Sequence, residues 1–140
     1  MNLYDYHSHP SQLDHFKDRF FLGVDNLDDL PKNASKEEAL IHLRNSPEEL
    51  GMYTQYHVDG RWPEAEKYIL KSPFASYIYA KMNLKEPWPE AEPIILDSVS
   101  TAVWYAIEVL QKRWPELEEL VRKEPREPHS WARYENRLMT

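Results

Sequence analysis

The chain has 140 residues, a net charge of −7 and no cysteine. This length favours one compact domain, and the lack of cysteine excludes disulfides and thiolate metal sites. No apolar run approaches the ~20 residues of a membrane span, and the first residues lack the regions of a signal peptide, so we expect a cytoplasmic protein. The acidic charge is spread along the chain without a basic stripe, which disfavours direct nucleic-acid binding.

Eleven prolines and only three glycines indicate an all-α fold made of many short helices. The first segment, residues 1–35, is predicted to form an N-terminal helical cap. Within it we expect a helix over residues 11–22, ended by Gly23, and one more turn at Leu27 and Leu30.

The most enzyme-like stretch lies near the start, where His7 and His9 follow Asp5. It resembles the opening metal motif of PHP-type phosphoesterases, in which two imidazoles at a strand end face one metal. That resemblance implies a metal-dependent hydrolase, which we keep as an alternative. Short helices cannot build the barrel that such enzymes need, so the sequence favours a surface turn here, with no catalytic residue, metal or cofactor.

The dominant pattern is a repeat, because Trp62, Trp88 and Trp114 recur at a fixed 26-residue interval. A fixed period of this size is typical of stacked supersecondary units. The first and last units are degenerate, as terminal repeats usually are. The predicted units span about 36–61, 62–87, 88–113 and 114–139, within a repeat region over 36–140.

Each unit reads as two short helices joined by a tight corner. In the second unit, Pro63 suits a first helical position, Glu64 and Glu66 favour the positive helix end, and Ser72 followed by Pro73 starts a second helix. The sequence therefore predicts a short α-solenoid of about four 26-residue helical-hairpin repeats with an N-terminal helical cap.

The outer units carry their own signals. Ser35 with Glu38 predicts a capping box, and Gly60 is expected to end a helix. In the fourth unit Pro125 and Pro128 delay the second helix to about His129.

Recurring residues are predicted to form the structural core rather than a site. Carboxylates at the helix starts could be read as catalytic pairs, and the tryptophans as base-stacking platforms, but their period places both in the scaffold. The expected core residues are Trp62, Trp88, Trp114, Ala65, Ala91, Ile69, Ile95, Tyr79, Tyr105, Ala80 and Ala106.

The strings "GRWPEAE" (residues 60–66), "PWPEAE" (87–92) and "AVWYA" (102–106) resemble the RWPEAE-type tandem helical repeat proteins of tailed bacteriophages and bacteria. This resemblance implies a phage-type origin and a small protein that binds a host protein.

The leading hypothesis is a non-enzymatic protein-binding module that inhibits or redirects a host protein, such as a defence or transcription component. Alternatives are an acidic nucleic-acid mimic that occupies a basic protein groove, and the metal-dependent hydrolase. The partner is expected to be a host or phage protein, not a membrane, and the oligomeric state stays open. Residues that break the recurrence are the candidate partner-binding residues: Tyr56, His57, Phe74, Tyr77, Met82, Trp104 and Glu108.

Overall fold

The structure, a computed structural model, describes residues 27–31, 33–124 and 128–140 of the chain. The predicted helix over 11–22 with Gly23 lies outside these residues. Every described element is helical and the described part contains no strand, so the all-α prediction is confirmed. Within this part, no helix combines the length and apolar character needed to cross a membrane.

A 3₁₀ turn at Leu27–Asp29 comes first, where the sequence predicted one more helical turn. The described α-helices that follow are α2 (Lys36–Leu43), α3 (Pro47–His57), α4 (Pro63–Ile69), α5 (Pro73–Ile78), α6 (Glu92–Ile95), α7 (Val99–Tyr105), α8 (Pro115–Lys123) and α9 (Trp131–Leu138). Two of them continue in π-helical segments, α5 over Tyr79–Leu84 and α7 over Ala106–Leu110, and a 3₁₀ turn at Pro89–Ala91 precedes α6.

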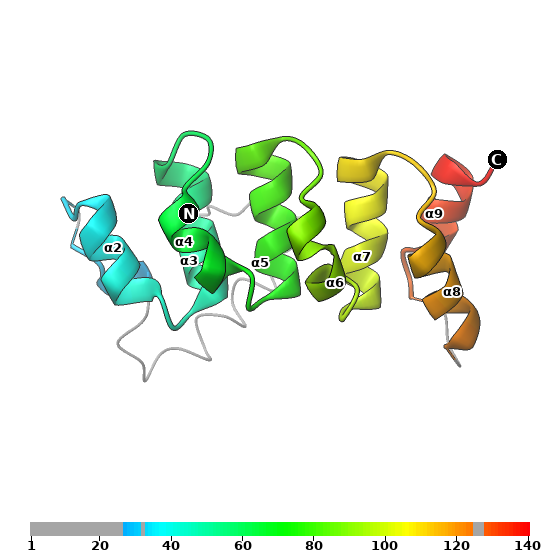
Figure 1. The fold of residues 1–140 in the computed structure, drawn as a ribbon, viewed down its shortest axis with the longest axis horizontal. Helices are drawn as coiled ribbons and strands as arrows, with labels where there is room; N and C mark the ends of the chain where they lie inside the picture. The colour runs from blue at the N-terminus through cyan, green and yellow to red at the C-terminus, as the bar shows by residue number, and fades with distance from the viewer. Residues whose placement is uncertain (1–26, 32, 125–127) are drawn as a thin grey trace.

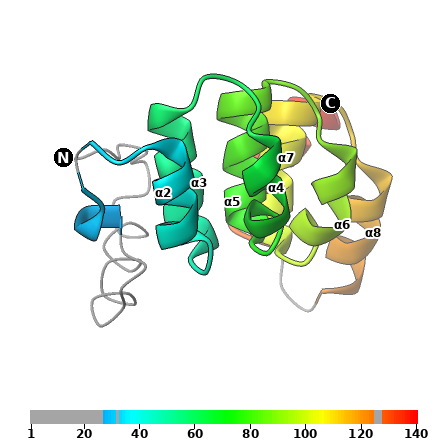
Figure 2. The same ribbon diagram turned by 60° about the vertical axis from the view of Figure 1, so that its left-hand side comes forward.

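The helices follow one another along the longest axis of the molecule, with α2 near one end and α9 at the other (Figure 1). Helices α3, α5, α7 and α9 pack one against the next. Helix α4 packs on α3, α6 packs between α5 and α7, and α8 packs on α7; the turned view separates α4 from α6 and α8 (Figure 2). One consequence is that α7 and α9 lie in contact at the C-terminal end of the row.

Local signals explain where the helices begin. Proline occupies a first helical position because its missing N–H has no intrahelical partner there. The described elements that begin at a proline start at Pro47, Pro63, Pro73, Pro89 and Pro115. The predicted capping box is confirmed, since Glu38 N–H donates to Ser35 Oγ at 3.1 Å and Ser35 N–H donates to Glu38 Oε1 at 2.8 Å.

The ends of the second helices follow a pattern that the sequence does not predict. Lys85 and Gln111 occupy equivalent positions of successive units, and both adopt the left-handed conformation, with φ of 57° and 56°. Their N–H groups donate to the carbonyls of Ala80 and Ala106, each at 2.7 Å. These bonds join residues five apart, so each helix widens into a π-turn before it stops.

Two predicted boundaries lie elsewhere in the structure. Gly60 has a φ of 80°, but α3 already ends at His57 and Val58 is its C-cap, so Gly60 lies in the loop beyond the helix end. The last helix begins at Trp131, two residues after His129.

A buried tyrosine fastens the corner between units. The Tyr79 hydroxyl accepts a hydrogen bond from the Trp62 N–H at 2.7 Å and donates one to Glu66 Oε2 at 2.7 Å. Its ring also contacts the Trp88 ring, with centroids 4.9 Å apart. Tyr79 therefore joins the start of its own unit to the start of the next, and we call this arrangement the Trp–Tyr–Glu set.

The set recurs twice more in the described residues. It is formed by Trp88, Tyr105 and Glu92 (2.8 and 2.8 Å) and by Trp114, Tyr134 and Glu118 (2.8 and 2.6 Å). The period pairs Tyr105 with Trp131, but the structure gives the role to Tyr134, three positions further along the chain. The tryptophan and tyrosine of this set are thus three residues further apart in the sequence than those of the other two sets, and Trp131 instead stacks on the Tyr134 ring, with centroids 4.3 Å apart.

Burial keeps these sets closed to solvent. Trp62, Trp88 and Trp114 are only 4%, 2% and 6% exposed, which leaves no ring face for a ligand. Burial is also the main cause that raises the pKa of Tyr134 to about 12. Its hydroxyl therefore keeps its proton and donates a hydrogen bond to Glu118. The recurring aromatic residues hold the helices together rather than form a binding surface.

Candidate functional site

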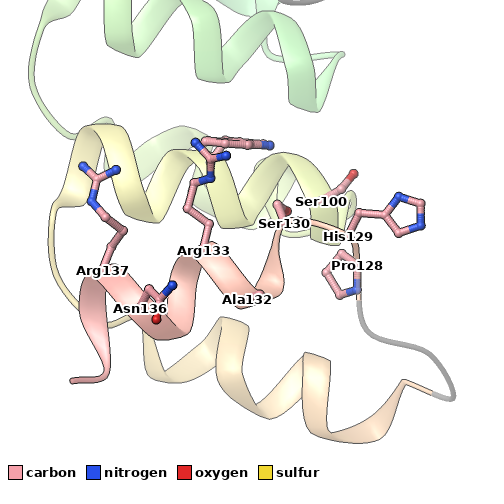
Figure 3. Close-up of a pocket in the computed structure, with 9 residues that line it drawn as sticks. Ser100, Pro128, His129, Ser130, Ala132, Arg133, Asn136 and Arg137 are labelled. Carbon is pink, nitrogen blue, oxygen red and sulfur yellow. The ribbon is translucent and has the colours of Figure 1, made fainter.

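A groove lies between α7 and α9, at the end of the molecule where the last unit is lengthened. Its volume is about 920 Å³ and it opens to solvent. Figure 3 shows the residues of α9 that line it, together with Ser100 at the start of α7. The full lining is Ser100, Trp104, Pro128, His129, Ser130, Ala132, Arg133, Asn136 and Arg137. We call it the α7/α9 groove.

Trp104 supplies the aromatic wall of this groove. It is half-buried, unlike the tryptophans of the Trp–Tyr–Glu sets. The Arg133 guanidinium lies over its ring, 5.1 Å from the centroid. This cation–π contact holds Arg133 against the ring, and none of its N–H groups is bound to a described residue.

Two arginines give the groove a positive charge. Arg133 and Arg137 stand one turn apart on α9 and extend from it on the same side (Figure 3). Neither guanidinium forms an ion pair or hydrogen bond with the described residues, and no carboxylate is among the lining residues. By contrast, Arg61 and Arg113 are each bound to a glutamate in the first turn of the helix that follows them, at 2.8 and 2.7 Å.

The start of α9 adds a hydroxyl to the same groove. Ser130 is the N-cap residue of α9, but its side chain does not cap the helix. Its Oγ is buried and has no hydrogen-bond partner in the part of the chain that the structure describes. Because the first N–H groups of a helix and its dipole favour negative charge, the beginning of α9 reinforces the preference of the groove for an anion.

Two of the predicted partner-binding residues contact each other instead of lining this groove. Tyr77 on α5 donates a short hydrogen bond to Glu108, at the end of α7, and Lys81 Nζ lies 2.8 Å from Glu108 Oε1. Tyr77 is only 5% exposed, and its burial, aided by Glu108, raises its pKa well above the ordinary value. This cluster ties α5 to the π-helical continuation of α7, and Lys81 is its exposed member.

The other candidates are spread along the second helices. Tyr56 and His57 line an apolar depression of about 500 Å³ beside Leu27 and Leu30. The positions equivalent to Tyr56 in the next two units carry Met82, which is exposed, and Glu108. These residues therefore occupy one face but do not form one pocket.

Phe74 is half-buried near the start of α5. Its ring contacts the Tyr77 ring, with centroids 6.1 Å apart. It belongs to the packing around α5 and does not line the α7/α9 groove. Of the predicted partner-binding residues, the α7/α9 groove contains Trp104 alone.

The predicted metal motif is not placed by the structure, because Asp5, His7 and His9 lie outside the described residues. Within the described ranges, no three histidine or carboxylate side chains are grouped so that they could hold a metal ion.

Sequence reasoning named Trp104 but missed Arg133, Arg137 and Ser130. A signal is present in the sequence: two arginines four residues apart fall on one helix face, in a chain whose net charge is negative. The 26-residue period hides this signal, because it places α9 three residues out of register.

Comparison of the chain with models of protein families, with curated protein sequences and with solved structures finds no match.

Proposed function

We propose that the protein is a short α-solenoid of four helical hairpins, at about 36–61, 62–87, 88–113 and 114–139, with residues 1–35 as its cap. The recurring Trp–Tyr–Glu sets support this architecture, because each set fastens one hairpin and touches the next. The left-handed helix ends at Lys85 and Gln111 support the same unit length. Such stacks expose long surfaces made of equivalent positions, which suit protein binding.

The protein acts as a non-enzymatic binding module for another protein. The observation that carries this proposal is the α7/α9 groove, which combines a half-buried tryptophan with two arginines that no described carboxylate neutralises. Tryptophan and arginine are the residue types most enriched at the energetic centres of protein interfaces. The resemblance to RWPEAE-type phage proteins supports a more specific role. In this role the protein is phage-encoded and inhibits or redirects a host defence or transcription component in the cytoplasm.

Affinity capture from a bacterial lysate tests this proposal. The full chain is immobilised beside Trp104→Ala, which alters the groove, and Ile41→Ala, which removes an exposed side chain on α2. Tyr56→Ala and Phe74→Ala probe the remainder of the second-helix face. We expect the wild-type chain and Ile41→Ala to retain the same protein and Trp104→Ala to lose it. Failure of the wild-type chain to retain any protein at any salt concentration would overturn the proposal.

A nucleic-acid mimic is a second candidate, favoured by a row of glutamates that recur at the helix starts. The row consists of Glu38, Glu64, Glu90 and Glu116, and all four are exposed. Two of these glutamates already accept hydrogen bonds within the chain, Glu38 from the Ser35 N–H and Glu90 from the Trp88 Nε1–H. If the chain is a mimic, the captured protein is a basic one that is released by salt and by Glu64→Gln with Glu116→Gln, while Trp104→Ala leaves capture unchanged.

A further inference from the structure

We infer that the α7/α9 groove recognises an acidic segment of its protein partner, in which two carboxylates at alternating positions of an extended chain are bound by Arg133 and Arg137. This inference rests on the proposed binding function and names the chemistry of the ligand. It has four supports: the geometry of Arg133, the spacing of the two arginines, the unpaired hydroxyl of Ser130 and the local charge.

Arg133 is held in place before any ligand arrives. Its guanidinium lies over the Trp104 ring at 5.1 Å, so the side chain has already lost part of its freedom. The contact leaves the guanidinium without a hydrogen bond to the described residues, and the donors of a guanidinium lie in its plane and point outward from its edge. A carboxylate accepts two parallel hydrogen bonds from such an edge, and this bidentate geometry is specific to arginine.

The spacing of the two arginines selects the spacing of the ligand. Arg133 and Arg137 are four residues apart on α9, so their Cβ atoms lie roughly 5–6 Å from each other. In an extended peptide, side chains on one face are two residues apart and roughly 6.6–6.8 Å from each other. A segment with two acidic residues separated by one other residue therefore places one carboxylate on each arginine.

Ser130 lies at the beginning of the same helix and lines the groove beside Arg133. Its Oγ is buried and has no partner in the described part of the chain, and unpaired buried polar atoms are uncommon in folded proteins. Its position at the start of α9 adds the favourable field of the helix dipole.

The local charge favours an acidic peptide over a single-stranded nucleic acid. A polynucleotide needs basic residues along its path and aromatic faces on which bases stack. Here the Trp104 ring is already in contact with the Arg133 guanidinium, and the lining holds only two basic side chains with a permanent charge, Arg133 and Arg137. The chain as a whole is acidic, with a net charge of −7. A short acidic segment matches the confined positive charge, whereas a longer row of phosphates would meet carboxylates.

Fluorescence anisotropy of labelled ten-residue peptides with the full chain tests the inference. The peptides carry two glutamates separated by one, two or three residues, and each has a twin with glutamine in both places. We expect the glutamate peptides to bind, the one-residue spacing to bind best, and each glutamine twin to bind at least about tenfold more weakly, since two charge-assisted contacts are lost. A single-stranded oligonucleotide of ten thymidines is run as a competitor and is expected to compete poorly.

Variants separate local recognition from overall charge. Arg133→Gln and Arg137→Gln are each expected to weaken binding of the best peptide about tenfold, and Arg133→Lys to weaken it by less. Arg61→Gln is the matched control, because it removes the same charge at a distant position and should leave the affinity unchanged. Thermal melting followed by circular dichroism shows that each variant is folded.

Three results would overturn the inference: equal binding of the glutamine twins, an equal loss in Arg61→Gln, or stronger binding of the oligonucleotide than of any peptide. The proposed function is tested separately, by capture from the lysate. If lysate capture depends on Trp104 but no acidic peptide binds, the groove is a protein-binding site without the acidic preference. If capture is also absent, the binding function is wrong as well.

Discussion

The third Trp–Tyr–Glu set, with the arginine beside it, and the α7/α9 groove use the same residue types, tryptophan and arginine, in different ways. In the third set Trp114 is buried, and Arg113 beside it is bound to Glu118 at 2.7 Å. In the groove Trp104 is half-buried, and Arg133 contacts the indole ring without a described carboxylate. Residues whose hydrogen bonds and charges are satisfied inside the unit maintain the fold. Residues that leave them open are available to a partner, and they occur where the 26-residue spacing is interrupted.

Removing a buried tryptophan should have the largest effect on stability, and it tests the difference between the sets and the groove. Trp88→Ala should lower the free energy of unfolding by about 3–5 kcal/mol, because it leaves a cavity against the Tyr79 ring. Trp104→Ala, at the half-buried position, should cost less than about 1.5 kcal/mol. Urea denaturation followed by circular dichroism compares the two. Similar losses at both positions would mean that Trp104 is part of the scaffold.

Removing one hydroxyl from a set should have the next largest effect. Tyr105→Phe leaves the buried Trp88 N–H without its acceptor at 2.8 Å and the Glu92 carboxylate without its donor, at a cost of about 1–3 kcal/mol. Tyr68→Phe is the control, since the Tyr68 hydroxyl makes no hydrogen bond to the described residues, and it should change stability by less than about 0.5 kcal/mol. An equal loss of stability in the two variants would mean that the Tyr105 hydroxyl does not stabilise the fold.

Acid should weaken the third set through Glu118. Hydrogen bonds from Arg113, and then from Tyr134, lower the pKa of Glu118 from 4.5 to about 2. A carboxyl whose pKa is lower in the folded state stabilises the fold when ionised, so its contribution is complete above pH 4.5 and is lost as the pH falls toward 2.

Glu118→Gln should therefore show a smaller decline in stability between pH 5 and pH 2 than the wild-type chain. The control is Glu116→Gln, at an exposed position in the first turn of the same helix, and it should decline as the wild type does. Melting temperatures measured across this range decide the point, and parallel curves for all three proteins would contradict it.

The smallest effect is expected from the exposed arginines. Arg113→Ala should have only a small effect on stability, because its ion pair with Glu118 is exposed to water and screened by it. Arg133→Ala should change stability by less than about 0.5 kcal/mol, since no ion pair with the described residues is lost. Denaturation midpoints of both variants sharpen the comparison. A loss for Arg133→Ala as large as that expected for Trp88→Ala would place Arg133 among the structural residues.

Helix starts were the most predictable part of this fold, because their signals are local. Proline at Pro63 and Pro73 and the Ser35–Glu38 capping box act within one helical turn. The π-turns before Lys85 and Gln111 were not predictable, because a shift from four-residue to five-residue hydrogen bonding depends on how the helix end packs.

The site was predictable only in part, because α9 does not follow the 26-residue period. The period assigns the tyrosine position of the third set to Trp131, whereas the residue that reaches the Trp114 N–H is Tyr134. Pro125 and Pro128 predicted a late second helix but not the number of added residues, and that number decides which α9 residues face α7. The place of Arg133 and Arg137 at the groove follows from the contact between α7 and α9 and not from the period.

Nuclear magnetic resonance of the full chain tests the central claim most directly. The five tryptophans provide five indole N–H signals, of which that of Trp104 belongs to the groove and those of Trp62, Trp88, Trp114 and Trp131 to buried positions. On titration with the peptide that carries two glutamates separated by one residue, we predict that the Trp104 signal and the Arg133 and Arg137 Nε–H signals move while the four buried indole signals stay. Movement of the buried indole signals with an unchanged Trp104 signal would contradict the separation of scaffold and binding site.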